Sequence, residues 1–69
     1  MTEKEAEYLD ALMGLEVAYA EVLRLEVTRF PESLTARGNG WVRRGETTRI
    51  TQAGATALGE HKQSAKAAS

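Results

Sequence analysis

The residues of this chain whose side chains could do chemistry gather between positions 41 and 50. They are Arg43, Arg44, Thr47, Thr48 and Arg49. Guanidinium groups donate paired hydrogen bonds to carboxylates and phosphates, and hydroxyl groups donate single ones. These residue types predict the binding of an anion. The sequence has no Ser/His/Asp set, no phosphate-cradling glycine loop and no cluster of metal ligands, so an enzyme is not expected.

The segment that carries these side chains has the pattern of a tight β-hairpin. It is rich in aromatic and β-branched residues, and Gly45–Glu46 would form a two-residue loop of type II′, whose first position takes a positive φ. This loop predicts a register. Arg44 pairs with Thr47, Arg43 with Thr48, Val42 with Arg49, and Trp41 with Ile50.

This register predicts which side chains share a face of the hairpin. Trp41 and Ile50 form an apolar cross-strand pair that docks on the core, so Trp41 is interpreted as a core anchor. Arg44 and Arg49 become diagonal neighbours on the outer face, where an anion would relieve the repulsion of like charges. The alternative is a solvated hairpin whose arginines pair with Glu46 or with carboxylates of the helices.

Length and composition set limits on the function. A chain of 69 residues is one small domain with a thin stability margin, and such a chain gains by dimerising. It contains no cysteine, and His61 is its single histidine, so no zinc site and no cofactor is expected. We find neither a signal peptide nor a long apolar run, which predicts a soluble cytoplasmic protein without a membrane contact.

The net charge of −1 hides an asymmetry between the two halves of the chain. Residues 1–30 carry three basic and seven acidic residues, which gives 3 − 7 = −4. Residues 31–69 carry six basic and three acidic residues, which gives 6 − 3 = +3. A scaffold helix followed by an anion-binding surface fits this pattern. Halves that pair with each other, or with a second copy, fit it equally well.

Residues 3–29 have helical spacing with a broad apolar stripe and acidic residues on the other side. Thr2 and Glu5 fit a capping box, which predicts the start of a helix. Gly14 costs only about 1 kcal/mol relative to Ala in a helix interior, which does not force a break. Two interpretations are open: one long helix, or two helices with a hinge near Gly14 or near Leu25.

Two further helices are predicted on either side of the hairpin. Pro31 ends the first helical segment and suits the first turn of a short helix over residues 31–37. Gly38 is expected to end that helix in the left-handed conformation. After the hairpin, Thr51 is expected to cap a helix over residues 52–62.

These elements together predict a small α+β domain that is mostly helical. It would contain a long N-terminal helix or two helices, a short helix, a two-stranded hairpin and a C-terminal helix. The domain would span residues 1–62. Residues 63–69 have little to bury and would form a disordered tail.

Residues 37–58 contain a strand-turn-helix pattern with recognisable positions. They include Arg37-Gly38, then Gly40-Trp41-Val42-Arg43-Arg44, then Ile50-Thr51-Gln52-Ala53-Gly54-Ala55-Thr56-Ala57-Leu58. This segment resembles the wing and the following helix of winged helix-turn-helix DNA-binding proteins. In that family an Arg-Gly-like turn, a Gly-Trp-Val-x-Arg strand and a Leu/Ile-Thr-x-x-Gly-x-x-Ala-Leu segment follow one another. The spacer over residues 38–40 is longer than the family pattern.

The resemblance implies a small DNA-binding transcriptional regulator, or a phage or plasmid accessory protein, that acts as a dimer on double-stranded DNA. The short helix would approach the major groove, where Arg37, with Ser33 or Thr35, would reach bases or phosphates. The hairpin would follow the phosphate backbone. The side chains expected to contact nucleic acid are Arg37, Arg43, Arg44, Thr47, Thr48 and Arg49.

A competing hypothesis is a protein-interaction or oligomerisation module that does not bind DNA. Its surface would be the apolar stripe of the first helical segment. The stripe residues are Leu12, Leu15, Tyr19, Val22 and Leu23. In this hypothesis the arginines would meet acidic protein surface, and a stable oligomer indifferent to DNA would distinguish it from the first.

Overall fold

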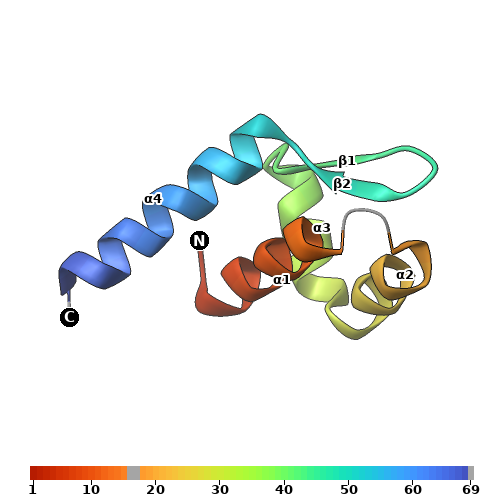
Figure 1. Ribbon diagram of the computed structural model, residues 1–69, viewed down its shortest axis with the longest axis horizontal. Coiled ribbons are helices and arrows are strands. Elements are labelled where there is room, and N and C mark those ends of the chain that lie inside the picture. The colour runs from red at the N-terminus through yellow and green to blue at the C-terminus, as the bar shows by residue number, and fades with distance from the viewer. Residues whose placement is uncertain (16–17, 69) are drawn as a thin grey trace.

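The computed structural model describes the backbone of residues 1–15 and 18–68, with side chains as far as residue 64 (Figure 1). Four helices and a two-stranded antiparallel hairpin make up this described part. They are α1 (Glu3–Gly14), α2 (Tyr19–Thr28), α3 (Phe30–Gly38), β1 (Val42–Arg44), β2 (Thr48–Ile50) and α4 (Gln52–Ala68). The predicted class, α+β and mostly helical, is confirmed.

The N-terminal half forms two helices, as the hinged interpretation predicted, and the break follows Gly14. The capping box is confirmed, since the backbone N–H of Glu5 donates to Thr2 Oγ1 at 3.1 Å and that of Thr2 donates to Glu5 Oε1 at 2.7 Å. A Cβ at Gly14 would meet nothing within 4 Å, so no packing requires glycine there. The break lets the apolar stripes of both helices face one core, which one straight helix could not do within a monomer.

Helix α3 starts directly after a single residue, Arg29, whose backbone N–H still bonds to α2. Pro31 lies in its first turn, as predicted. The prediction that Gly38 takes the left-handed conformation is wrong: Gly38 is the last helical residue, and Gly40 has the positive φ, 74°. The reason is Asn39, whose backbone N–H and side-chain amide both donate to the Thr35 carbonyl and extend the helix end.

The hairpin forms, but its predicted register is wrong by one residue. Its cross-strand pairs are Val42 with Ile50, Arg43 with Arg49, and Arg44 with Thr48. The loop therefore has three residues, 45–47, and Gly45, which has no positive φ, donates its N–H to the Thr47 carbonyl at 3.1 Å. A slip of one residue moves every side chain of one strand to the other face. Here tertiary contacts choose the register, because Thr48 is buried and bonds to Glu26 of α2.

Thr51 joins the hairpin to α4. Its Oγ1 accepts the backbone N–H of Gly54 at 3.1 Å, which confirms the predicted N-cap. The same hydroxyl donates to the Gly40 carbonyl at 2.7 Å, and the Thr51 N–H donates to the Trp41 carbonyl at 2.8 Å. The predicted helix end near Lys62 is wrong, since α4 continues to Ala68. Its last turns contain alanine, lysine and glutamine, which favour helix, and no residue that breaks one.

The core lies between α1 and the other elements. Its buried apolar residues are Ala6, Tyr8, Leu9, Leu12, Val22, Leu25, Ala36, Val42 and Leu58. Trp41 and Ile50 are half-buried and pack against this cluster, so the interpretation of Trp41 as a core anchor is confirmed, although Ile50 pairs with Val42 instead. None of the described helices is both long enough and apolar enough to cross a bilayer.

Candidate nucleic-acid interface

Two arginines lie directly opposite each other on the outer face of the hairpin. Arg43 of β1 and Arg49 of β2 are cross-strand partners, and both are exposed. They line a hollow of about 400 Å³ together with the loop residues 45–47. Like charges at directly opposed positions destabilise a strand pair, and an anion bound between them relieves this repulsion. The structure thus brings together Arg43 and Arg49 of the predicted set, whereas the Thr47 Oγ1, expected to donate to phosphate, is buried and has no hydrogen-bond partner among the described residues.

The other face of the hairpin carries Arg44 and Thr48, and it turns toward the helices. Thr48 is only 2% exposed, and its hydroxyl donates to a carboxylate oxygen of Glu26. Its expected role as a donor to phosphate is therefore wrong in this structure. Arg44 stays exposed on this face, so it is not a neighbour of Arg49 on the outer face as the predicted register required.

A groove of about 510 Å³ separates Arg44 from α2 and α3. Its lining residues are Leu23, Glu26, Val27, Phe30, Ser33, Arg37 and Arg44. Arg37, the predicted base-contacting residue, thus lies in the groove with Arg44 and apart from the hollow of Arg43 and Arg49. Its Nε is buried and has no hydrogen-bond partner among the described residues.

Ser33 and Thr35, the two hydroxyl residues of α3 expected to contact DNA beside Arg37, differ in exposure. Ser33 is 3% exposed and accepts a long hydrogen bond, 3.4 Å, from the Tyr8 hydroxyl, so it cannot reach a base. Thr35 is exposed, with its hydroxyl donated to the Pro31 carbonyl at 3.1 Å. Burial raises the pKa of Tyr8 above its ordinary value, while the bond to Ser33 lowers it in part. Tyr8 is therefore a neutral core phenol rather than a surface one.

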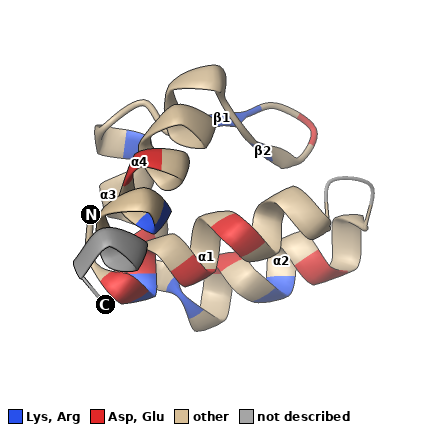
Figure 2. Cartoon of the chain, turned by 60° about the vertical axis from the view of Figure 1, so that its left-hand side comes forward, with Lys and Arg blue, Asp and Glu red and all other residues tan. Residues whose placement is uncertain are grey.

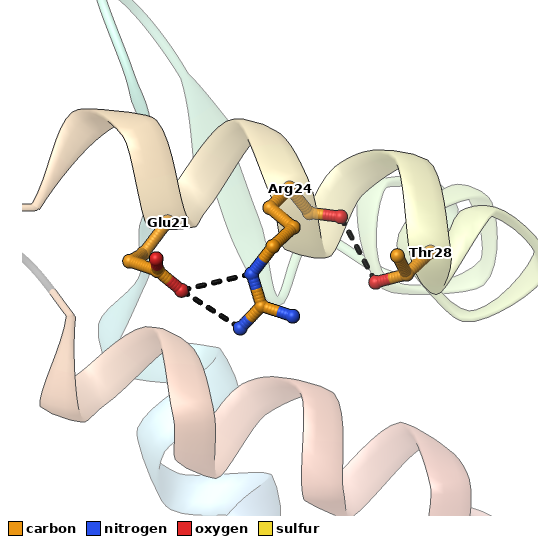
Figure 3. Close-up of polar contacts among 3 residues, drawn as sticks. All are labelled: Glu21, Arg24 and Thr28. Carbon is orange, nitrogen blue, oxygen red and sulfur yellow. Dashed lines mark hydrogen bonds and ion pairs between the residues drawn. The ribbon is translucent and has the colours of Figure 1, made fainter.

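The acidic residues lie mainly along α1 and α2, as Figure 2 shows, and several are paired within the chain. Glu21 accepts two hydrogen bonds from the Arg24 guanidinium, at 2.9 and 2.7 Å (Figure 3). Asp10 of α1 pairs with Lys62 of α4 at 2.9 Å. The Asp10–Lys62 contact joins the acidic half to the basic half, which was one of the open explanations for the charge asymmetry.

The predicted interface stripe does not exist as one surface, because the break after Gly14 divides it. Leu12 and Val22 are 2% and 1% exposed and belong to the core, and Leu15 packs against it. Tyr19 and Leu23 remain exposed.

Tyr19 and Leu23 belong to an exposed apolar face on α2 and α3, and the sequence-based interface lacked its other residues, Val27, Phe30 and Leu34. The residues of this face are Tyr19, Leu23, Val27, Phe30 and Leu34, with exposed fractions of 40% to 78%. The signal was present in the spacing: if α2 is a separate helix that buries Val22 and Leu25, then residues 19, 23 and 27 must share another face.

Comparison with family models, with curated proteins and with solved structures finds no match to this chain. Among the described residues, no group of three or more histidine, aspartate or glutamate side chains is placed to hold a metal ion.

Proposed function

We propose that this chain binds double-stranded DNA through the outer face of its hairpin, as a small regulator or accessory protein of winged-helix type. The proposal rests on Arg43 and Arg49, which lie directly opposite each other on an exposed face of the hairpin. The loop that ends at Thr47 lies beside them. Two guanidinium groups at opposed positions can each bind a phosphate oxygen of one backbone. Such contacts position a protein on DNA without reading its sequence.

The order of elements supports the same proposal. A short helix, α3, precedes the hairpin, and a close-packed helix, α4, follows it, in the order that the winged-helix resemblance implies. Thr35 is the exposed hydroxyl residue of α3 that could approach a base, whereas Arg37 lies in the groove with Arg44. The register puts Arg43, and not Arg44, on the same face as Arg49, so of the three hairpin arginines expected to contact phosphates the proposal keeps Arg43 and Arg49.

The test is a titration of a labelled random-sequence duplex, read by fluorescence anisotropy at two salt concentrations. Two phosphate contacts per chain predict a slope of about −2 for log K against log salt, which is about a tenfold loss of affinity between 50 and 200 mM. The double variant Arg43→Ala/Arg49→Ala is expected to lose both the binding and the slope.

Arg24→Ala is the matched control for this titration. Arg24 is also an exposed arginine, but it lies on α2, outside the hairpin, where it pairs with Glu21, so its loss should leave DNA affinity nearly unchanged. An equal loss in the control and in Arg43→Ala would mean that only net charge matters. No binding by the unmodified protein at low salt would remove the proposal.

A further inference from the structure

The groove between α2, α3 and β1 has an apolar wall and a basic wall. Leu23, Val27 and Phe30 form the apolar wall, and their exposed fractions are 40%, 78% and 55%. Arg37 and Arg44 form the basic wall, and neither makes an ion pair with another described residue. This combination differs from the hairpin's outer face, which carries arginines without apolar neighbours in its hollow.

The apolar wall continues along the surface beyond the groove. Residues 19, 23 and 27 are spaced by four, so they form a row about 12 Å long on α2, and Leu34 extends the face on α3. Large apolar side chains this exposed and this close together mark an interaction surface. A row of about 12 Å fits two turns of an amphipathic helix, which presents apolar anchors at i, i+3 or i+4, and i+7.

The charges of the groove determine which helix fits. Glu26 lines the groove, but its carboxylate is engaged by the Thr48 hydroxyl, and two arginines against one glutamate give 2 − 1 = +1. The Nε of Arg37 is buried without a hydrogen-bond partner among the described residues, so no described acceptor satisfies that donor. A carboxylate binds a guanidinium by strong paired hydrogen bonds, so the complementary ligand is acidic beside its apolar anchors.

We propose that this groove binds an acidic amphipathic helix of a partner protein. The apolar face of that helix would cover Leu23, Val27 and Phe30, and carboxylates on its flank would meet Arg37 and Arg44. The site is separate from the proposed DNA contact, because Arg44 and Arg43 lie on opposite faces of the hairpin.

A second copy of this chain is a poorer occupant of the groove. Its acidic helix, α1, uses Glu7 and Asp10 in ion pairs with Arg29 and Lys62 of the same chain. The large apolar residues of α1, apart from Met13, are buried in the core. A helix that offers carboxylates without free apolar anchors cannot cover the apolar wall.

The experiment uses two fluorescein-labelled helical peptides and the full chain. One peptide carries leucines at i, i+3, i+4 and i+7 with glutamates on both flanks, and the other has lysines in place of those glutamates. Anisotropy should show saturable binding of the glutamate peptide and binding at least about tenfold weaker for the lysine peptide.

Three variants test whether the glutamate peptide binds in this groove. Val27→Ser should weaken the glutamate peptide about tenfold, since it removes an anchor contact but changes no buried residue. Arg44→Glu should exchange the preference, so that the lysine peptide binds better than the glutamate peptide. Arg43→Glu is the matched control: it makes the same charge change one residue away, on the other face, and should alter neither peptide. Arg44→Gln, which adds no charge, serves if Arg44→Glu unfolds.

Several outcomes would overturn the proposal. Failure of the glutamate peptide to bind, or an equal loss in Arg43→Glu and Arg44→Glu, would do so. Displacement of the peptide by duplex DNA, with DNA affinity lost in Arg44→Glu and kept in Arg43→Glu, would assign the groove to nucleic acid. A dimer in sedimentation that Val27→Ser dissociates, without peptide binding, would assign it to a second copy. Because the proposed DNA contact depends on Arg43 and Arg49, the peptide titrations alone neither support nor refute it; DNA affinity kept in Arg43→Glu would refute it.

Discussion

Gly54 lets α4 approach the base of the hairpin more closely than any other residue would allow. A Cβ built there would lie 2.1 Å from the Trp41 carbonyl oxygen and 2.9 Å from Ile50 Cγ1. The oxygen belongs to the backbone and already accepts the Thr51 N–H, so it cannot rotate away. Gly54→Ala must therefore push α4 from the hairpin by about 1 Å, and overpacking of this kind costs about 1–3 kcal/mol.

Gly59 is the matched control on the same helix. A Cβ there would meet nothing within 4 Å, so Gly59→Ala should bring only the helix preference for alanine, about 1 kcal/mol of added stability. Alanine's helix preference acts at both positions, so the free energies of unfolding of the two variants should differ by the overpacking cost alone, about 1–3 kcal/mol, with Gly54→Ala the less stable. In a domain of this size, each kcal/mol of that difference separates the melting temperatures by about 4–8 °C.

Urea unfolding followed by Trp41 fluorescence and by far-ultraviolet circular dichroism measures both variants. Trp41 lies at the affected contact, so its fluorescence also reports a local shift that leaves the helices intact. If Gly54→Ala were as stable as Gly59→Ala, the close approach of α4 to the hairpin would not exist in solution, and the argument from geometry would fail.

Three further predictions follow from single contacts. Thr51→Ala removes the cap of α4 and the hydrogen bond to the Gly40 carbonyl, and urea unfolding should show a loss of about 1–2 kcal/mol. Because the folded-state pKa of Tyr8 is raised, its contribution to stability is full below about pH 10 and declines as pH rises through the folded value; unfolding measured on either side of pH 10 should show a smaller decline in Tyr8→Phe. Lys62→Ala breaks an exposed pair with Asp10 and should change the free energy of unfolding by less than about 1 kcal/mol, with no change at high salt.

Elements specified by local hydrogen bonds could be predicted from the sequence. The capping box at Thr2 and the N-cap at Thr51 depend on side chains within three residues of the helix start, and both are present. The short helix after the first helical segment was also predicted, because the fixed φ of Pro31 suits the first turn of a helix; the structure starts that helix one residue earlier, at Phe30.

The break between α1 and α2 and the register of the hairpin both depend on contacts between residues far apart in the sequence. The sequence left the first open and led to a wrong prediction of the second. Gly14 costs a helix only about 1 kcal/mol, which is small beside the free energy gained by burying the core. The break is therefore explained by the core that α1 and α2 share. The observed register buries Val42 and Thr48 on one face of the hairpin and lets Thr48 bond to Glu26, 22 residues away. Since a slip of one residue exchanges the faces of one strand, the same error placed Arg44 rather than Arg43 beside Arg49 on the outer face.

The candidate site was predicted in composition but not in arrangement. All four arginines of the predicted set are at the surface or half-buried, yet they divide into Arg43 with Arg49 and Arg37 with Arg44. Two adjacent residues of β1 thereby serve different surfaces, which periodicity alone would show only with the correct register.

The joint at Thr51 has a mechanical consequence. Three hydrogen bonds and the close contact at Gly54 fasten the base of the hairpin to the first turn of α4, while Thr48 bonds the hairpin to Glu26 of α2 and Lys62 pairs α4 with Asp10 of α1. Figure 1 shows α4 leading away from the hairpin on the other side of this joint. The joint therefore sets the angle between the axis of α4 and the hairpin, with Arg43 and Arg49 on its outer face.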